Sequence, residues 1–126
     1  MYVEYNPSPT KARVGDCAVR AVTKVLGVDW DTAYLMLCLK GYNMGDMPSS
    51  NAVIDACLRE KGYVRRMLPD SCPQCYTLEQ FSQDHSQGVY IVGTGSHVAA
   101  VVDGVIYDSW DSSNEYPIYY WEKERK

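Results

Sequence analysis

The chain lacks any apolar run long enough to cross a bilayer, and it lacks the opening of a secretory signal peptide. Its longest apolar stretches, such as residues 98–102, fall far short of the roughly 20 residues that a membrane-spanning helix needs. The first four residues, Met-Tyr-Val-Glu, carry neither the basic segment nor the apolar core of an export signal. We therefore expect a cytoplasmic protein with no membrane partner.

An excess of positive charge is also missing. Twelve Lys and Arg residues against sixteen Asp and Glu residues leave a net charge of -4 at pH 7 and a pI near 5.0. General attraction to a phosphate backbone therefore has no source in the net charge. The two basic clusters, residues 61–66 and 123–126, are interpreted as solvated surface. We expect no nucleic-acid partner.

The cysteines do not form the even set that a disulfide framework requires. They stand at positions 17, 38, 57, 72 and 75. An odd number of cysteines without an export signal favours reduced thiols. Cys38 and Cys57 lie in helical apolar patterns and are interpreted as small buried hydrophobic residues.

What the chain does contain is enough apolar sequence for one core. Its 126 residues, 46% hydrophobic and 22% charged, fit a single domain over residues 1–126 and exclude disorder. Helical spacing follows an extended lead over residues 1–14, and strand-like runs follow the helices, so we predict an α+β fold with N-terminal helices packed on a C-terminal antiparallel β-sheet. The expected helices begin at Cys17, after Asp29, after Ser49 or Ser50 and at Thr77, and end at Gly27, Gly41, Gly62 and Asp84. The expected strands are 63–68, 89–92, 97–102, 105–108 and a closing edge strand, 117–121.

A tight hairpin makes one strand register predictable. Asp103-Gly104 between two β-branched runs is a strong signal for a two-residue type I′ turn. That turn puts Ala99 opposite Asp108, so His97 and Asp108 become diagonal neighbours on one face. Diagonal Cα atoms lie about 7 Å apart, within reach of an imidazole and a carboxylate. The pattern therefore predicts a His97–Asp108 pair.

Two neighbours of Asp108 have different predicted places. Trp110 falls directly opposite His97 on the same face, where it could cover the pair and exclude water. Asp111 has the opposite parity and should point through to the other side, unless a bulge intervenes. Asp108 is therefore the preferred orienter of His97.

Cys17 is the candidate nucleophile. It falls in the first turn of a predicted helix, where unsatisfied amides and the helix dipole favour thiolate over thiol. His97 would take or hold the thiol proton, Asp108 would fix the imidazole tautomer, and the Cys17 amide would help hold an oxyanion. The implied reaction is acyl transfer, most simply hydrolysis, and it requires no cofactor.

These three segments, in this order, resemble the papain-like cysteine peptidase superfamily. They are Gly15-Asp16-Cys17 opening a helix, Gly95-Ser96-His97-Val98 starting a strand, and Tyr107-Asp108-Ser109-Trp110. The compact bacterial members are nearest, including the peptidase domains that cleave bacteriocin leaders and the NlpC-type amidases. The pattern is also similar to small uncharacterised proteins of Firmicutes and their phages. The resemblance, over residues 6–121, implies a papain-like fold acting on a peptide or protein as a peptidase, amidase or isopeptidase.

The sequence departs from the family at the oxyanion hole. Papain-like enzymes usually carry a Gln a few residues before the Cys, where this chain has Thr10 and Lys11, so Asn6 becomes the candidate donor. Asp16 beside the nucleophile would oppose thiolate formation if its carboxylate faced the sulfur. Without a donor, the chain would be a catalytically inactive papain-like binding module, or a phage accessory protein that holds a host protein.

Two further patterns have weaker interpretations. Cys72-Pro73-Gln74-Cys75 has the spacing of half a zinc knuckle, with His85 ten residues further on, but a structural zinc needs four ligands and a surface turn is preferred. The eleven tyrosines fit half-buried strand positions, and a tyrosine-rich rim could also recognise an extended peptide or a partner protein.

Overall fold

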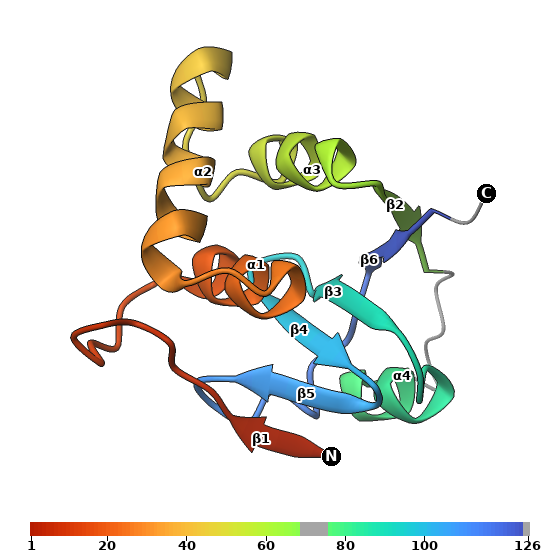
Figure 1. Ribbon diagram of the computed structural model, residues 1–126. Helices are drawn as coiled ribbons and strands as arrows, with labels where there is room; N and C mark the ends of the chain where they lie inside the picture. Colours follow the sequence, from red (N-terminus) through yellow and green to blue (C-terminus); the bar gives the residue numbers. More distant parts are fainter. Residues whose placement is uncertain (69–75, 125–126) are drawn as a thin grey trace.

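The computed structural model describes residues 1–68 and 76–124 (Figure 1). Within these residues four helices and six strands form, and the strands make one sheet in the order β1-β5-β4-β3-β6-β2. The helices are α1 (Cys17–Leu26), α2 (Trp30–Met44), α3 (Asn51–Glu60) and α4 (Leu78–Asp84). The strands are β1 (Tyr2–Glu4), β2 (Tyr63–Met67), β3 (Val89–Gly93), β4 (Val98–Val102), β5 (Val105–Asp108) and β6 (Tyr119–Lys123). The predicted α+β class is confirmed.

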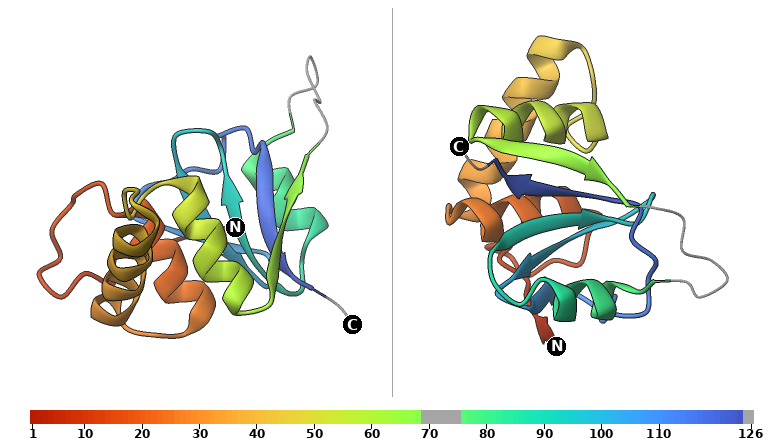
Figure 2. Two further views of the ribbon diagram at one scale, coloured as in Figure 1. Left: turned by 90° about the horizontal axis from the view of Figure 1, so that it is seen from above. Right: turned by 90° about the vertical axis from the view of Figure 1, so that its right-hand side faces the viewer.

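The sheet carries a core on each face. Because successive strand residues point to opposite faces, Val98 and Ala100 of β4 pack in the cluster that includes α1, whereas Ala99 and Val101 pack in the cluster that includes α4. The view from above in Figure 2 shows α1, α2 and α3 on one side of the sheet and α4 on the other. In the described part of the chain, no helix has both the length and the apolarity to traverse a bilayer.

The predicted hairpin is confirmed in turn and register. Asp103 and Gly104 both have positive φ, 50° and 79°, as a type I′ turn requires. Val102 pairs with Val105, and Ala100 pairs with Tyr107. This register brings the start of β4 beside the end of β5.

The prediction of a purely antiparallel C-terminal sheet is wrong. β1 pairs in parallel with β5, with Tyr2 opposite Ile106, so the sheet is mixed. The last strand is also not an edge strand and does not begin at Pro117: β6 lies between β3 and β2, and Trp121 pairs with Ile91 on one side and Arg65 on the other. The edges are instead β1 and β2, two strands from earlier in the chain.

The second helix does not stop at Gly41 as predicted. It continues to Met44, and Gly45 supplies the left-handed residue, with φ 71°, that ends it. Gly41 serves close packing, because a Cβ there would lie 2.7 Å from the carbonyl oxygen of Asp46 and 3.3 Å from the nitrogen of Pro48. This close approach lays the segment after α2 back against its own helix.

Replacing Gly93 with alanine should destabilise the protein by about 1–3 kcal/mol through overpacking. The new Cβ would lie 2.1 Å from Cε2 of Tyr119, whose side chain is buried against β3. Gly15→Ala is the matched control, because a Cβ there meets nothing within 4 Å. Urea unfolding measures both variants, and an unchanged midpoint for Gly93→Ala would contradict this packing.

Candidate active site

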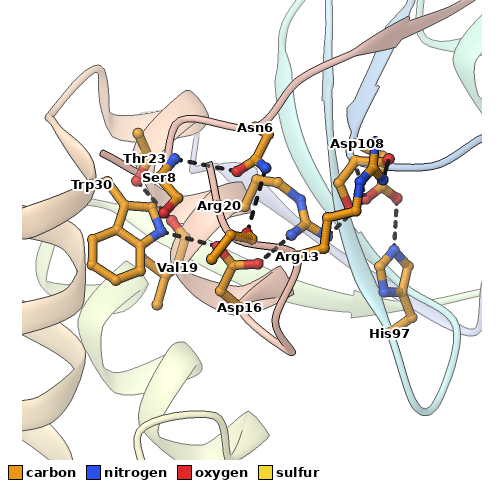
Figure 3. Close-up of polar contacts among 12 residues, drawn as sticks. Asn6, Ser8, Arg13, Asp16, Val19, Arg20, Thr23, Trp30, His97 and Asp108 are labelled. Atoms are coloured by element: carbon orange, nitrogen blue, oxygen red, sulfur yellow. Dashed lines mark hydrogen bonds and ion pairs between the residues drawn. The ribbon is translucent and has the colours of Figure 1, made fainter. Parts of the chain in front are cut away.

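His97 and Asp108 form a buried pair where β4 begins and β5 ends. His97 Nε2 lies 2.6 Å from Asp108 Oδ2, and the side chains are 12% and 0% exposed (Figure 3). The ring of Trp110 lies 4.8 Å from the imidazole, centroid to centroid. Asp111 binds its own loop instead, accepting hydrogen bonds from the Ser113 backbone and hydroxyl. The structure thus brings His97, Asp108 and Trp110 together as predicted, and Asp111 makes its hydrogen bonds in the segment after β5.

Cys17 is the first residue of α1 and shares two cavities with His97. One, here called the small cavity, has a volume of about 150 Å³, and the other, the large cavity, about 530 Å³. Because Asp108 binds Nε2 of His97, Nδ1 is the ring nitrogen left to serve the thiol. The helix dipole of α1 further favours negative charge on the Cys17 sulfur.

The electrostatics of this pair favour a thiolate and an imidazolium. Burial alone would raise the pKa of Cys17, but His97, the Val98 backbone and the charge of Arg20 together lower it below its usual value. Burial alone would lower the pKa of His97, but interactions with Asp108 and Cys17 outweigh burial and raise that pKa to about 9. Each group thus stabilises the charged form of the other.

Asp108 is held in place by four donors. Oδ2 accepts from His97 and from the Ser112 hydroxyl at 2.7 Å, while Oδ1 accepts from the Ser109 N–H at 2.8 Å and from Arg20 Nη2 at 2.9 Å. Burial would raise the pKa of this carboxyl, but its donors and the His97 charge lower it. The carboxylate can therefore keep both its charge and its orientation.

The carboxylate of Asp16 is bound by two donors and does not oppose the Cys17 thiolate as it would if it faced the sulfur. Its Oδ1 accepts a 2.5 Å hydrogen bond from Arg20 Nη1, and its Oδ2 accepts one of 3.0 Å from Trp30 Nε1. Figure 3 shows Arg20 between the carboxylates of Asp16 and Asp108. A buried polar chain therefore runs from Trp30 to His97, through residues on α2, the α1 entry, α1 and β5.

Asn6 was predicted to donate to the oxyanion, but its side chain does not reach the site. Its side-chain amide donates to the carbonyl oxygens of Lys11 and Ala12, at 3.4 and 3.5 Å, and its Oδ1 accepts from the Ser8 N–H. It therefore stabilises the loop before α1 (Figure 3). Asn6 is not among the described residues that line the small or the large cavity.

Asn51, unlike Asn6, lines a cavity of the site. It is the first residue of α3 and lines the small cavity together with Cys17 and His97. Within residues 1–68 and 76–124 its side-chain amide makes no hydrogen bond, so two N–H donors remain available. Asp16 does not cap α1 with its side chain, so the backbone N–H of Cys17 is free of a side-chain acceptor as well. Both residues that carry these donors line the small cavity.

The weaker metal hypothesis rests on residues that the structure does not place. Cys72 and Cys75 lie outside the described residues. His85 has a structural setting: its ring stacks on Phe81 at 3.9 Å, and its Nδ1 lies 2.9 Å from the Phe81 carbonyl oxygen. No group of three or more metal-binding side chains occurs in residues 1–68 and 76–124.

Sequence reasoning missed three residues of the site: Arg20, Ser112 and Asn51. Arg20 left a signal, because an arginine four residues after Asp16 interrupts the apolar stripe of a predicted core helix. Asn51 left none, because the path of the segment before α3 decides whether it meets Cys17. Ser112 belongs to the irregular segment after β5, where no strand register applies.

The arrangement provides a thiol and an imidazole at one cavity, a buried carboxylate behind the imidazole, and N–H donors from the Cys17 backbone and the Asn51 side chain. These are the groups that nucleophilic attack on a carbonyl and proton transfer to a leaving group require. Comparison of the chain with protein-family models, with curated proteins and with solved structures found no match.

Proposed function

We propose that the protein is a cysteine-dependent hydrolase of papain-like type that cleaves an amide, isopeptide or related acyl bond in a peptide or protein. The observation that carries this proposal is the placement of His97 between the Asp108 carboxylate, at 2.6 Å, and the Cys17 thiol at a helix N-terminus. The papain-like assignment is supported by chain order: the cysteine helix comes first, the histidine follows directly before β4, and the aspartate ends the neighbouring strand β5.

The first half-reaction forms a thioester. The Cys17 thiolate attacks the substrate carbonyl carbon, and the carbonyl electron pair moves onto the oxygen. When the tetrahedral intermediate collapses, the carbon–nitrogen bond breaks and the imidazolium of His97 gives its proton to the leaving amine. Asp108 holds the ring in the orientation that both steps need.

The second half-reaction restores the enzyme. Neutral His97 accepts a proton from water as the water oxygen attacks the thioester carbon. Collapse then breaks the carbon–sulfur bond, which releases the carboxylic acid and regenerates the Cys17 thiolate with the His97 imidazolium. In both halves, the oxyanion would accept hydrogen bonds from the Cys17 N–H and the Asn51 side-chain amide.

Selective alkylation at acidic pH tests the thiolate. An ordinary thiol with a pKa near 8.5 is only about 1% thiolate at pH 6.5. The site lowers the pKa of Cys17, whereas burial raises the pKa of Cys57. Iodoacetamide at pH 6.5 should therefore modify Cys17 at least about tenfold faster than Cys57. Peptide mass spectrometry measures each site.

Two variants complete this test. Cys17→Ser should remove the fast-labelled site, and His97→Gln should slow labelling of Cys17, because the charge that stabilises the thiolate is gone. Fast labelling at Cys38 or Cys57, or labelling of Cys17 that ignores His97→Gln, would contradict the proposed site. Fast alkylation without turnover of any activated ester would instead favour the binding module.

The pH dependence of the cleavage of a peptide amide, measured as release of its amine, has a definite sign, because this leaving group must be protonated as it departs. Turnover should be retained at pH values where Cys17 is ionised and His97 is protonated. It should fall as the pH rises through about 9, because the imidazolium that protonates the leaving group is then lost.

A further inference from the structure

The large cavity is lined by charge of the opposite sign to that of the whole protein. The chain has a net charge of -4, yet no aspartate or glutamate occurs among the described residues that line this cavity. Two arginines, Arg13 and Arg20, line it together with Cys17 and His97. When Cys17 is acylated, its negative charge is lost and the arginines remain. Such a cavity favours a bound group of negative charge.

Arg13 is the arginine of this cavity that a substrate can reach. Its side chain is 68% exposed, whereas Arg20 is buried and already binds the carboxylates of Asp16 and Asp108. Arg13 Nη1 donates to the carbonyl oxygen of Ser109 at 3.0 Å. This hydrogen bond fixes the guanidinium at the residue that directly follows Asp108, and Figure 3 shows Arg13 beside that carboxylate.

The guanidinium of Arg13 already holds one carboxylate, and this carboxylate can be exchanged. Its Nη2 lies 3.3 Å from Oε2 of Glu4, whose side chain is 64% exposed. Solvent screens an exposed pair of this kind, so a substrate carboxylate can replace that of Glu4 at little cost. A guanidinium has five N–H donors, and within residues 1–68 and 76–124 Arg13 uses two of them. Arg13 can therefore bind a further carboxylate.

The position of His97 decides which side of the scissile bond Arg13 serves. His97 protonates the leaving amine, and Trp110, whose ring lies 4.8 Å from the imidazole, lines the large cavity with it. Arg13 lines the same cavity and binds the backbone of Ser109, next to Trp110. Asn51, the proposed oxyanion donor, lines the small cavity and is not among the described residues of the large one. Arg13 therefore lies on the leaving-group side.

From this arrangement we propose that the leaving amine of the substrate is a peptide segment with a carboxylate within its first two residues, and that Arg13 binds this carboxylate. An aspartate or glutamate side chain, or a free carboxyl terminus, supplies the same chemical group. This proposal rests on the proposed hydrolase function and names the chemistry of its leaving group.

Transfer of an acyl group from Cys17 to an added amine tests the leaving-group side directly. The p-nitrophenyl ester of acetylglycylglycine forms the thioester, and an amine then competes with water for it. The amine nitrogen bonds to the thioester carbon, neutral His97 accepts the proton that the amine loses, and the carbon–sulfur bond breaks. This step is the reverse of acylation by a peptide, so the amine occupies the place of the leaving amine. Chromatography gives the ratio of amide product to acid product.

Two pairs of amines differ in one carboxylate that replaces a carboxamide. They are the α-amides of aspartate and asparagine, and glycylglycine and its amide, each compared at equal concentration of the unprotonated amine. In at least one pair the carboxylate member should raise the ratio of amide to acid product about threefold or more over its partner. The pair that shows this preference distinguishes a side-chain carboxylate from a terminal one.

Substitutions of Arg13 test whether the preference comes from its charge. Arg13→Gln should bring the two members of each pair to about equal ratios, and Arg13→Glu should reverse the preference. Glu4→Gln should increase it, because the competing carboxylate is gone. Arg59→Gln is the matched control, and it should keep the preference: Arg59 is 61% exposed, binds one carboxylate at 2.7 Å and is not among the described residues of the large cavity. Each preference compares two amines in one protein, so a change in the overall rate at Cys17 does not alter it.

The outcomes separate the two proposals. If the ester acylates Cys17 but neither carboxylate gains over its amide, or only water reacts, the acidic leaving group is overturned and the hydrolase stands. A carboxylate preference that survives Arg13→Gln also overturns this assignment. If the ester does not acylate Cys17, the proposed function fails and this substrate class fails with it. A preference that is lost in Arg13→Gln, reversed in Arg13→Glu and kept in Arg59→Gln would support the assignment.

Discussion

Asn51→Ala is expected to slow the acylation of Cys17 by an activated ester about 10²–10³-fold, the usual loss when one oxyanion donor is removed. The same change should leave alkylation of Cys17 by iodoacetamide nearly unchanged. Alkylation displaces iodide from a saturated carbon and develops no oxyanion. The ratio of the two rates therefore isolates the contribution of the donor from the reactivity of the thiolate.

Asn6→Ala is the matched control for this experiment. Asn6 precedes the nucleophile in the sequence, and Asn51 follows it. The side-chain amide of Asn6 already donates to the carbonyl oxygens of Lys11 and Ala12. Its removal should leave both rates unchanged. Asn51→Ala should not unfold α3, because Ser50 caps that helix by accepting from the Ala52 N–H.

Opposite results would reassign the oxyanion donor. Equal acylation in Asn51→Ala and the unchanged protein would remove Asn51 from the mechanism. A selective loss in Asn6→Ala would return that role to the segment before Cys17, as the family resemblance implies. A parallel fall of acylation and alkylation in Asn51→Ala would show that the residue acts on the thiolate instead.

The His97–Asp108 pair could be predicted because its geometry is local. A two-residue turn at Asp103-Gly104 fixes the register, and eleven residues of chain then determine which side chains meet. Cys17 could be predicted from the start of an amphipathic helix. Each of these inferences depends on only a short segment of sequence.

Other features depend on packing between distant segments. β1 is three residues long and pairs with a strand more than 100 residues later, with no sequence signal for the parallel direction. Asn51 shares the small cavity with Cys17, and the segment that leads to it packs closely on Gly41 of α2. The predicted strand 63–68 pairs, as β2, with the outer side of β6 and so moves β6 from the edge into the sheet. In each case a long-range contact overrides the local pattern.

Arg20→Met is expected to lower the free energy of unfolding by about 3–5 kcal/mol, because removal of one partner from a buried ion pair leaves uncompensated charge. Arg20 is 4% exposed and contacts two carboxylates, Asp16 at 2.5 Å and Asp108 at 2.9 Å. Methionine fills much of the volume but leaves both carboxylates without this cation. Urea unfolding at pH 7 measures the change.

The chain contains a closely matched control in Arg59. Like Arg20, it pairs with an aspartate four residues earlier, Asp55, at 2.7 Å, but its side chain is 61% exposed. Solvent screens such a pair, so Arg59→Met should change the free energy of unfolding by about 1 kcal/mol or less. Similar losses in the two variants would mean that the network around Arg20 is not desolvated.

Alkylation of the folded variants separates a role in catalysis from a role in stability. The charge of Arg20 is one of the causes that lower the pKa of Cys17, so Arg20→Met should raise that pKa and slow alkylation at pH 6.5. Arg59→Met should not change that rate. At a pH above the pKa of Cys17 in both proteins, the alkylation rates of Arg20→Met and the unchanged protein should converge, because Cys17 is then ionised in each. A rate that stays low at high pH would instead mean that loss of the Asp16–Arg20–Asp108 contacts has moved Cys17 itself, and Arg20 would then position α1 without tuning its thiol.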